Sequence, residues 1–228
     1  MRITVGILEQ QGKHTSPVYP TTDIISRWSF DDDNGDDTSG NGYDIDACLG
    51  IPTYAAGKVN DCLVLDNSTN MVNTSYYDDV STLTMAFWYK CNTQTENGGV
   101  IMVAETSIGA AKWYGLLTTT DTLEVGLDPY QSWYPGPSIT VDNAWHFIIA
   151  QCDSGTYEIW EDNVSLGTST PGIFPQPVFP GEIVRVGGYT AITPQQWGFN
   201  GSLDNMYVYD RILTSAERDA LWNNGNGI

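Results

Sequence analysis

Short apolar segments alternate with polar turns along most of the chain. From residue 24 onward these segments are rich in Val, Ile, Tyr, Phe and Trp, and Gly, Asn, Asp and Pro separate them. Such composition favours the pleated, half-buried surface of a β-strand. The pattern predicts strands at 24–30, 62–66, 71–74, 83–90, 99–105, 113–118, 122–127, 145–152, 156–163, 182–188 and 202–210. Many short antiparallel strands at this spacing are typical of two sheets packed face to face.

The segment 156–163 shows the two-residue period of a strand most clearly, because apolar and polar positions alternate along it. Asp162 and Asn163 follow the apolar positions, and Asn tolerates left-handed backbone, so we expect a tight hairpin there. The same alternation places Glu158 and Glu161 on opposite faces of the strand.

The C-terminal region carries the helix signals of this otherwise β-rich sequence. Thr214 and Glu217 form a T-x-x-E capping box, and Gly225 is placed to end the helix. Apolar side chains at 220–222 supply a docking surface. We therefore expect one short C-terminal helix that closes the edge of the sandwich after the last strand.

The first 23 residues differ from the rest, because they are polar, contain proline and carry balanced charge. We expect a terminal arm over residues 1–23, suited to docking on another subunit, and one β-sandwich domain over residues 24–228. The arm begins at Met and lacks an apolar core followed by a small-residue cleavage site, so it does not resemble a signal peptide.

Charge narrows the possible partners. The chain has 28 acidic and 9 basic residues, for a net charge of −19. Such a field repels nucleic acid and anionic lipid, and it suits cations such as Ca²⁺, although acids also serve solubility alone. The sequence has no apolar stretch of about 20 residues, so we expect no membrane span.

The four cysteines lack the C-x-x-C spacing of a zinc site. They are Cys48, Cys62, Cys91 and Cys152, and all lie in or near predicted strands. This placement favours buried free thiols over disulfides, without excluding the latter.

Several motifs resemble one family. The segment RWSFDDDNGDDTSGNGYDIDACLGIPTYAAGKVNDCLVLD (27–66) resembles the opening of laminin G-like domains of the concanavalin A-like lectin/glucanase superfamily. Later segments are similar to that family's subsequent strands, hairpin, closing strand and helix, in the same order: LTMAFWYK (83–90), NAWHFIIAQCDSGTYEIWEDNVSLG (143–167) and FNGSLDNMYVYDRILTSAERDALWNNG (199–225). The resemblance covers residues 24–228 and implies a jelly-roll sandwich.

This resemblance also implies a cation site. In the family the first and last strands are neighbours, and an acid at the position of Asp204 joins loop oxygens in holding Ca²⁺. We therefore expect a structural Ca²⁺ site formed by Asp31, Asp37, Asn41 and Asp204, completed by carbonyls and waters because Ca²⁺ takes about six to eight oxygens. The alternative is a solvated acidic turn in which Asp37 and Ser39 bond the local backbone.

Aromatic residues in and near loops are candidates for ligand contact. Flat rings stack on the apolar faces of sugars, and nearby amides and carboxylates bond hydroxyl groups. The candidates are Trp113, Tyr114, Tyr130, Trp133, Tyr134 and Trp197. The competing interpretation is that these rings cover the ends of the sandwich or fill a protein interface.

Catalytic motifs are not apparent. Glycosidases need two carboxylates that flank one bond, and the E-x-D-x-x-E pattern of the superfamily's glucanases is missing. His146 has no recognisable nucleophile partner, so we expect an ordinary strand residue.

The sequence therefore predicts a non-catalytic lectin-like binding or adhesion protein that contacts glycans. The Met start, the arm and the acidity favour a virion surface component, such as a capsid decoration, fibre or tail protein, at a virion surface or extracellular location. A polysaccharide-active glycoside hydrolase or lyase is the alternative.

Overall fold

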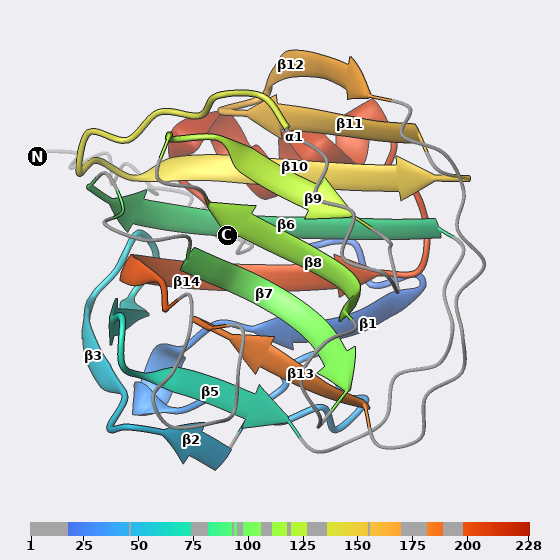
Figure 1. Ribbon diagram of the computed structural model, residues 1–228. Helices are drawn as coiled ribbons and strands as arrows, with labels where there is room; N and C mark the ends of the chain where they lie inside the picture. The colour runs from blue at the N-terminus through green and yellow to red at the C-terminus, as the bar shows by residue number, and fades with distance from the viewer. Residues whose placement is uncertain are drawn as a thin grey trace, which may run out of the picture.

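The computed structural model describes residues 18–45, 47–73, 82–92, 94, 98–105, 111–117, 120–126, 136–154, 156–169, 182–188 and 198–228. Within these residues the chain forms fourteen β-strands and one α-helix, arranged as two antiparallel sheets packed face to face (Figure 1). The predicted all-β, two-sheet sandwich with one short C-terminal helix is confirmed.

The larger sheet has eight strands, and the last strand of the chain lies in its interior. Its order is β12 (Val164–Ser169), β11 (Thr156–Glu161), β10 (His146–Asp153), β6 (Thr82–Cys91), β14 (Asn200–Tyr209), β4 (Asp61–Asp66) and β3 (Thr53–Ala56), with β1 (Ile24–Trp28) also paired to β14. One side of β14 is lined by β6. The other side is lined first by β4 and then by β1. The first and last strands of the sandwich are thus neighbours, as the resemblance implied.

The smaller sheet has six strands and forms the second wall of the core. Its order is β2 (Ala47–Leu49), β5 (Asn70–Asn73), β13 (Glu182–Val186), β7 (Gly98–Glu105), β8 (Ala111–Leu117) and β9 (Leu123–Gly126). Alternate residues of each sheet meet in a buried cluster that includes Trp28, Phe87, Ile148, Val184 and Leu203. The register is therefore fixed by burial, since a slip of one residue would expose this set.

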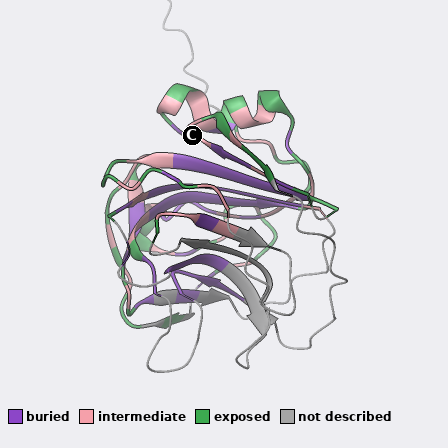
Figure 2. Cartoon of the chain, turned by 45° about the horizontal axis from the view of Figure 1, so that its top comes forward, coloured by how far each residue is buried: buried purple, intermediate pink, exposed green. Residues whose placement is uncertain are grey.

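The helix α1 (Ser215–Trp222) lies on the outer face of the eight-stranded sheet, which corrects the prediction that it closes the edge (Figure 2). The residues of β6 that point away from the core are apolar there, notably Trp88, so this face also needs a cover. Leu221 and Trp222 provide it. The helix ends when Asn223 adopts a left-handed conformation (φ 47°), two residues before the predicted stop at Gly225.

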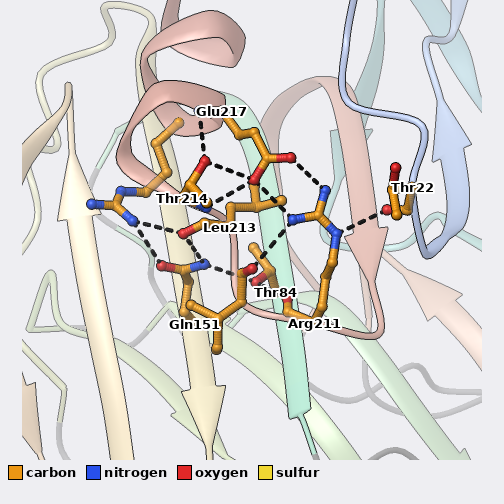
Figure 3. A network of polar contacts seen from close by, with 9 residues as sticks. Thr22, Thr84, Gln151, Arg211, Leu213, Thr214 and Glu217 are labelled. Carbon is orange, nitrogen blue, oxygen red and sulfur yellow. Dashed lines mark hydrogen bonds and ion pairs between the residues drawn. The ribbon is translucent and has the colours of Figure 1, made fainter.

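The start of the helix is tied to the sheet by a polar network (Figure 3). The predicted capping box is present, because the amide and hydroxyl of Thr214 both donate to the Glu217 carboxylate, and the Glu217 amide donates to the Thr214 hydroxyl. Two guanidinium nitrogens of Arg211 donate to the same carboxylate at 2.8 and 2.7 Å. The Arg211 Nε donates to the carbonyl of Thr22. Helix, last strand and N-terminal segment thus meet at one ion pair.

This ion pair should make stability depend on acidity. Hydrogen bonds from Arg211 hold the pKa of Glu217 at about 2, below its usual range. A carboxyl with a depressed pKa stabilises the fold above its unfolded-state pKa, and that contribution is lost as pH falls through the folded-state value. We expect Glu217→Ala to lower the free energy of unfolding by about 1–2 kcal/mol near neutral pH and to flatten the decline of stability between about pH 5 and 2.

Urea unfolding across this pH range measures both effects. Asp219→Ala is the matched control, because Asp219 is an exposed acid on the same helix that bonds only the Asn163 amide in the described contacts. An equal acid response in both variants would contradict the assignment to the Arg211 pair.

Three strands escaped the sequence prediction. They are β2, β3 and β12, which form edges of the sheets and include Ala, Gly and Ser, residues that weaken the strand signal. The predicted hairpin at Asp162 and Asn163 is confirmed, since both have positive φ (50° and 64°).

The four cysteines are free thiols, in agreement with the favoured prediction. Cys48 is the exception on burial, because it lies exposed on the edge strand β2, whereas the other three are buried.

The described part of the predicted arm, residues 18–23, packs against the sandwich. The Tyr19 ring lies 5.8 Å from the Tyr207 ring, and Arg27 lies over it at 4.7 Å. The packed fold therefore begins before residue 24. Residues 1–17 of the predicted arm lie outside the described residues. The described helices include none that is long and apolar enough to span a bilayer.

Candidate functional site

Asp204 lies at a break in the register of β14, where its neighbour changes from β4 to β1. Asn205, the next residue, has a positive φ of 42°. Both side chains are fully buried. The buried side chains of Asp204 and Asn205 both require hydrogen-bond partners, because an unpaired buried polar group costs free energy.

The hairpin turn between β3 and β4 supplies partners for Asp204. The backbone amides of Lys58 and Val59 donate to Asp204 Oδ2 at 2.7 and 2.9 Å. Gly57 permits this approach, because a Cβ there would lie 2.5 Å from the same oxygen. The turn with the sequence Gly57-Lys58-Val59 is therefore an amide cradle for the acid of the last strand. The Asn205 side chain donates to the other oxygen, Oδ1, at 3.0 Å.

Asp31 approaches the same turn from the end of β1. Its Oδ1 accepts a hydrogen bond from the Asp61 amide at 3.3 Å. The pKa of Asp204 is raised to about 7, mainly by burial and in smaller part by the negative charge of Asp31, although the amide hydrogen bonds act to lower it. The structure thus brings together two acids, Asp31 and Asp204, that the sequence places far apart.

The turn that carries Asp31 has an unusual backbone. Phe30, Asp32 and Asp33 all have positive φ, between 56° and 62°. Non-glycine residues adopt this region at a cost, which the surrounding structure must offset. The burial of Phe30 in the core holds the turn in place.

The positively charged side chain of Arg27 lies on the side of Asn205 away from Asp204. The Arg27 Nη2 donates to Asn205 Oδ1 at 2.7 Å, and the Tyr207 hydroxyl donates to the same oxygen at 3.2 Å. The guanidinium of Arg27 lies over the rings of Tyr19 and Tyr207, at 4.7 and 5.4 Å from their centroids. Asn205 therefore separates the acid Asp204 from the guanidinium of Arg27, an arrangement that no sequence motif indicated.

Asp37 and Asn41 do not join Asp31 and Asp204, which corrects the predicted four-residue site. Asp37 pairs with Trp28 on the side of β1 opposite β14. Its carboxylate accepts four hydrogen bonds, from the amides of Arg27, Ser39 and Tyr43 and from the Ser39 hydroxyl. It thus orders the loop, as the alternative interpretation held.

The Asn41 side chain binds elsewhere. Its Nδ2 donates to the carbonyls of Ile24 and Ile25, at the start of β1, whereas Asp31 follows the end of that strand. Among the described residues no group of three or more His, Cys, Asp or Glu side chains is arranged to hold a metal ion. A cation beside Asp204 would therefore depend on two carboxylates, with carbonyls and water as the remaining ligands.

Such a cation fits the chemistry of the pair in one respect. The hydrogen bonds described for Asp204 come from uncharged N–H groups, and the negative charge of Asp31 acts to raise its pKa. A divalent ion would neutralise both carboxylates, which Ca²⁺ favours as ligands.

The predicted aromatic contacts fall mainly outside the described residues. Trp113 and Tyr114 lie in β8 of the six-stranded sheet, and their backbone positions are described. Tyr130, Trp133, Tyr134 and Trp197 lie outside the described residues.

One residue of the six-stranded sheet was missed by sequence reasoning. Arg185 is 3% exposed, although its neighbours Val184 and Val186 point into the core and strand alternation turns Arg185 to the outer face. Its cross-strand partner is Met102, which in turn pairs with Tyr114. The flanking valines in the sequence IVRV are the signal that could have identified it.

The family model of the concanavalin A-like lectin/glucanases superfamily matches residues 66–217. No curated protein sequence matches the chain.

Solved structures share the fold. Domain 4 of AbnA, a GH43 extracellular arabinanase from Geobacillus stearothermophilus in complex with arabinotriose, has a TM-score of 0.67 and 18% identity, with 85% of this chain and 95% of that chain covered. The binding domain of botulinum neurotoxin DC in complex with SialylT has a TM-score of 0.66 and 13% identity, with 89% and 52% covered.

A structure of botulinum neurotoxin type C, whose cell entry depends on interaction with two ganglioside molecules, has a TM-score of 0.67 and 12% identity, with 89% of this chain and 51% of that chain covered. The chain thus spans about half the length of the toxin chains it matches. At these identities the likeness shows the fold. Because the family model covers more than half of the sequence, the chain belongs to the concanavalin A-like lectin/glucanase superfamily.

Proposed function

We propose that the protein is a non-catalytic, lectin-like module that binds carbohydrate. The observation that carries this proposal is the match to domain 4 of the arabinanase, because the chain covers 95% of that domain, whose structure holds arabinotriose. The similarity is thus between two whole domains. The toxin binding domain in complex with SialylT adds a second relative of the same fold.

The proposed contact surface is the outer face of the six-stranded sheet. Tyr114 belongs to β8 of this sheet, and Tyr130 and Trp133 follow β9 in the sequence. Aromatic rings offer stacking surfaces for sugars, and a few polar groups fix orientation. The opposite sheet is unsuited to this role, because α1 covers its outer face.

Non-catalytic action is supported by the position of one acid pair. Tyr157 and Ile159 of β11 point into the core, which places Glu161 on the core side and Glu158 on the outer side. The Glu161 carboxylate accepts hydrogen bonds from the Tyr89 hydroxyl and the Thr140 amide. These two acids cannot flank one glycosidic bond, as a glycoside hydrolase requires. The enzyme alternative would therefore need acids elsewhere.

A glycan array that includes arabino-oligosaccharides and sialylated glycans tests the proposal. We expect binding to a defined glycan class, and Trp133→Ala or Tyr114→Ala should weaken it by about tenfold or more if the ring is a contact. Trp145→Phe is the matched control, because Trp145 packs on the opposite sheet and binding should not change. Silence of the folded wild type across the array would overturn the proposal.

We also propose a structural Ca²⁺ bound by Asp31 and Asp204. The support is the buried carboxyl of Asp204 beside the half-buried carboxyl of Asp31, at the junction of β1, β4 and β14. These two side chains would hold the ion and thereby fasten the start of the sandwich to its end. Asp37 and Asn41 would keep their roles in the loop. Thermal unfolding with calcium and with chelator tests this, and equal melting would dispose of it.

The virion location stays a prediction from the sequence. It would require assembly with other subunits, which light scattering of the purified chain measures directly. Together with glycan binding it would describe a lectin-like surface component.

A further inference from the structure

His146, which the sequence indicated as an ordinary strand residue, lies between two acids. Its Nδ1 is 2.8 Å from Asp162 Oδ2, and its Nε2 is 3.1 Å from Asp142 Oδ1. The imidazole is 14% exposed, whereas the two carboxylates are 33% and 55% exposed, respectively. Each ring nitrogen is therefore within hydrogen-bond distance of a carboxylate oxygen.

The proton count of this arrangement follows from its chemistry. An ionised carboxylate accepts hydrogen bonds and cannot donate them, and a neutral imidazole carries one N–H. Two short contacts to carboxylates therefore require an imidazolium with both nitrogens protonated. The Asp142 acid is ionised, because a hydrogen bond from the Ala144 amide and another from His146 lower its pKa.

The two acids belong to different parts of the fold. Asp162 is in the hairpin between β11 and β12, and its Oδ1 accepts a hydrogen bond from the Phe147 amide at 2.9 Å. Asp142 is in the segment 136–145, which crosses from the six-stranded sheet to the eight-stranded sheet. At its start this segment bonds β9, since the Leu123 amide donates to the Pro137 carbonyl.

The crossing segment covers one side of the core. Ile139 is 8% exposed, and Val141 packs against the core cluster. Glu161 holds the middle of the segment, because it accepts hydrogen bonds from the amide and hydroxyl of Thr140. His146 holds its end through Asp142.

We propose that protonated His146 links the crossing segment 136–145 to the β11–β12 hairpin, and that deprotonation weakens this link. In the imidazolium form it binds Asp142 and Asp162 together. Loss of one proton removes one of the two contacts. The contact to Asp142 is the one released, because that carboxylate is the more exposed and has water as an alternative partner. The end of the crossing segment then loosens over Ile139 and Val141.

The direction of the pH response follows from the groups that face the ring. Burial lowers the pKa of His146, but hydrogen bonds to Asp162 and Asp142, and the negative charge of Glu161, outweigh it and raise the pKa above its usual range. Tyr89 faces the ring from β6, with ring centroids 5.8 Å apart. A raised folded-state pKa means that the stabilisation is complete below the unfolded-state pKa and is lost as pH rises through the folded-state value.

Amide hydrogen exchange followed by NMR tests this. The reporters are the Asn143 and Ala144 amides, which donate to Cys91 O and Asp142 Oδ1. At pH below the His146 titration, we expect exchange in His146→Gln to be about tenfold faster than in the wild type, the factor for one lost charge-assisted hydrogen bond. The difference should vanish above the titration. Comparing the two proteins at each pH removes the intrinsic pH dependence of exchange.

A second measurement remains decisive if that variant does not fold. In the wild type the ¹⁵N signals of the His146 ring should show both nitrogens protonated at neutral pH, and Asp142→Asn should lower the pH at which they change. His14→Gln assigns the signals, because the chain has two histidines. A neutral His146 ring at pH 7, or equal protection in the wild type and His146→Gln at every pH, would overturn the proposal.

Discussion

Replacing Asp204 with alanine should lower the free energy of unfolding by about 3 kcal/mol, even without metal. The change leaves the partly buried amides of Lys58 and Val59 without their acceptor, and an unsatisfied buried donor costs about 1–3 kcal/mol. Removing a buried carboxylate whose pKa is raised offsets part of this loss. Urea unfolding of the wild type and the variant in the presence of chelator measures the effect.

Two further variants sharpen this test. Asp204→Asn keeps an acceptor oxygen for the turn and should cost less than the alanine variant. Asp36→Ala removes an exposed acid from the neighbouring loop and should change stability by less than about 0.5 kcal/mol. If Asp204→Ala were as stable as Asp36→Ala, the amide cradle would not stabilise the fold.

Calcium adds a separable term. A ligand that binds only the native state stabilises it by about 2.7 kcal/mol at a hundredfold excess over its Kd. We expect calcium to raise the melting temperature of the wild type and to leave Asp204→Ala unchanged. A wild type that ignores calcium would refute the metal proposal and leave the hydrogen-bond prediction intact.

Replacing Trp88 with alanine should be the most damaging change on the outer face of the eight-stranded sheet. Trp88 is 1% exposed, and its ring lies 5.0 Å from Phe147 and 5.3 Å from Trp222. The Lys58 Nζ lies 4.6 Å from the same ring. Loss of this side chain leaves a cavity between β6 and α1, and we expect about 3–5 kcal/mol of lost stability by urea unfolding.

The helix should also become easier to cleave in limited proteolysis. Trp222→Ala should cost less, because Trp222 is only half-buried, and a double-mutant cycle should give about 0.5–1.5 kcal/mol of coupling between the two rings. Ile51→Ala, at a position 83% exposed, is the control and should be nearly neutral. A loss for Trp88→Ala no larger than for this control would contradict the packing of α1 on the sheet.

Local signals explain most of what the sequence predicted. The capping box at Thr214 and the hairpin at Asp162 depend on neighbouring residues, and both are present. The pairing of the first and last strands was predicted from the family resemblance, because the residue pattern within one strand does not show which strand lies beside it. The outer-face position of α1 was missed, because the apolar residues on both faces of β6 around Trp88 do not indicate which element covers the outer face.

The site was predicted less well, for a related reason. Asp31 and Asp204 meet because β4 and β1 share one side of β14, a long-range arrangement. Asp37 was grouped with them by sequence proximity, but a carboxylate two residues before Ser39 finds closer donors in its own loop. Asp31 and Asp37, which are close in sequence, therefore lie apart in the fold, whereas Asp31 and Asp204, which are far apart in sequence, lie close together.

Native mass spectrometry of the wild type with a panel of arabino-, galacto- and sialyl-oligosaccharides tests whether the protein binds carbohydrate without cleaving it, because it measures the mass of the complex and of the glycan in one experiment. We expect complexes that contain the intact glycan after prolonged incubation. Shortened glycans would show that the protein is an enzyme, and the lack of any complex from folded protein would contradict carbohydrate binding.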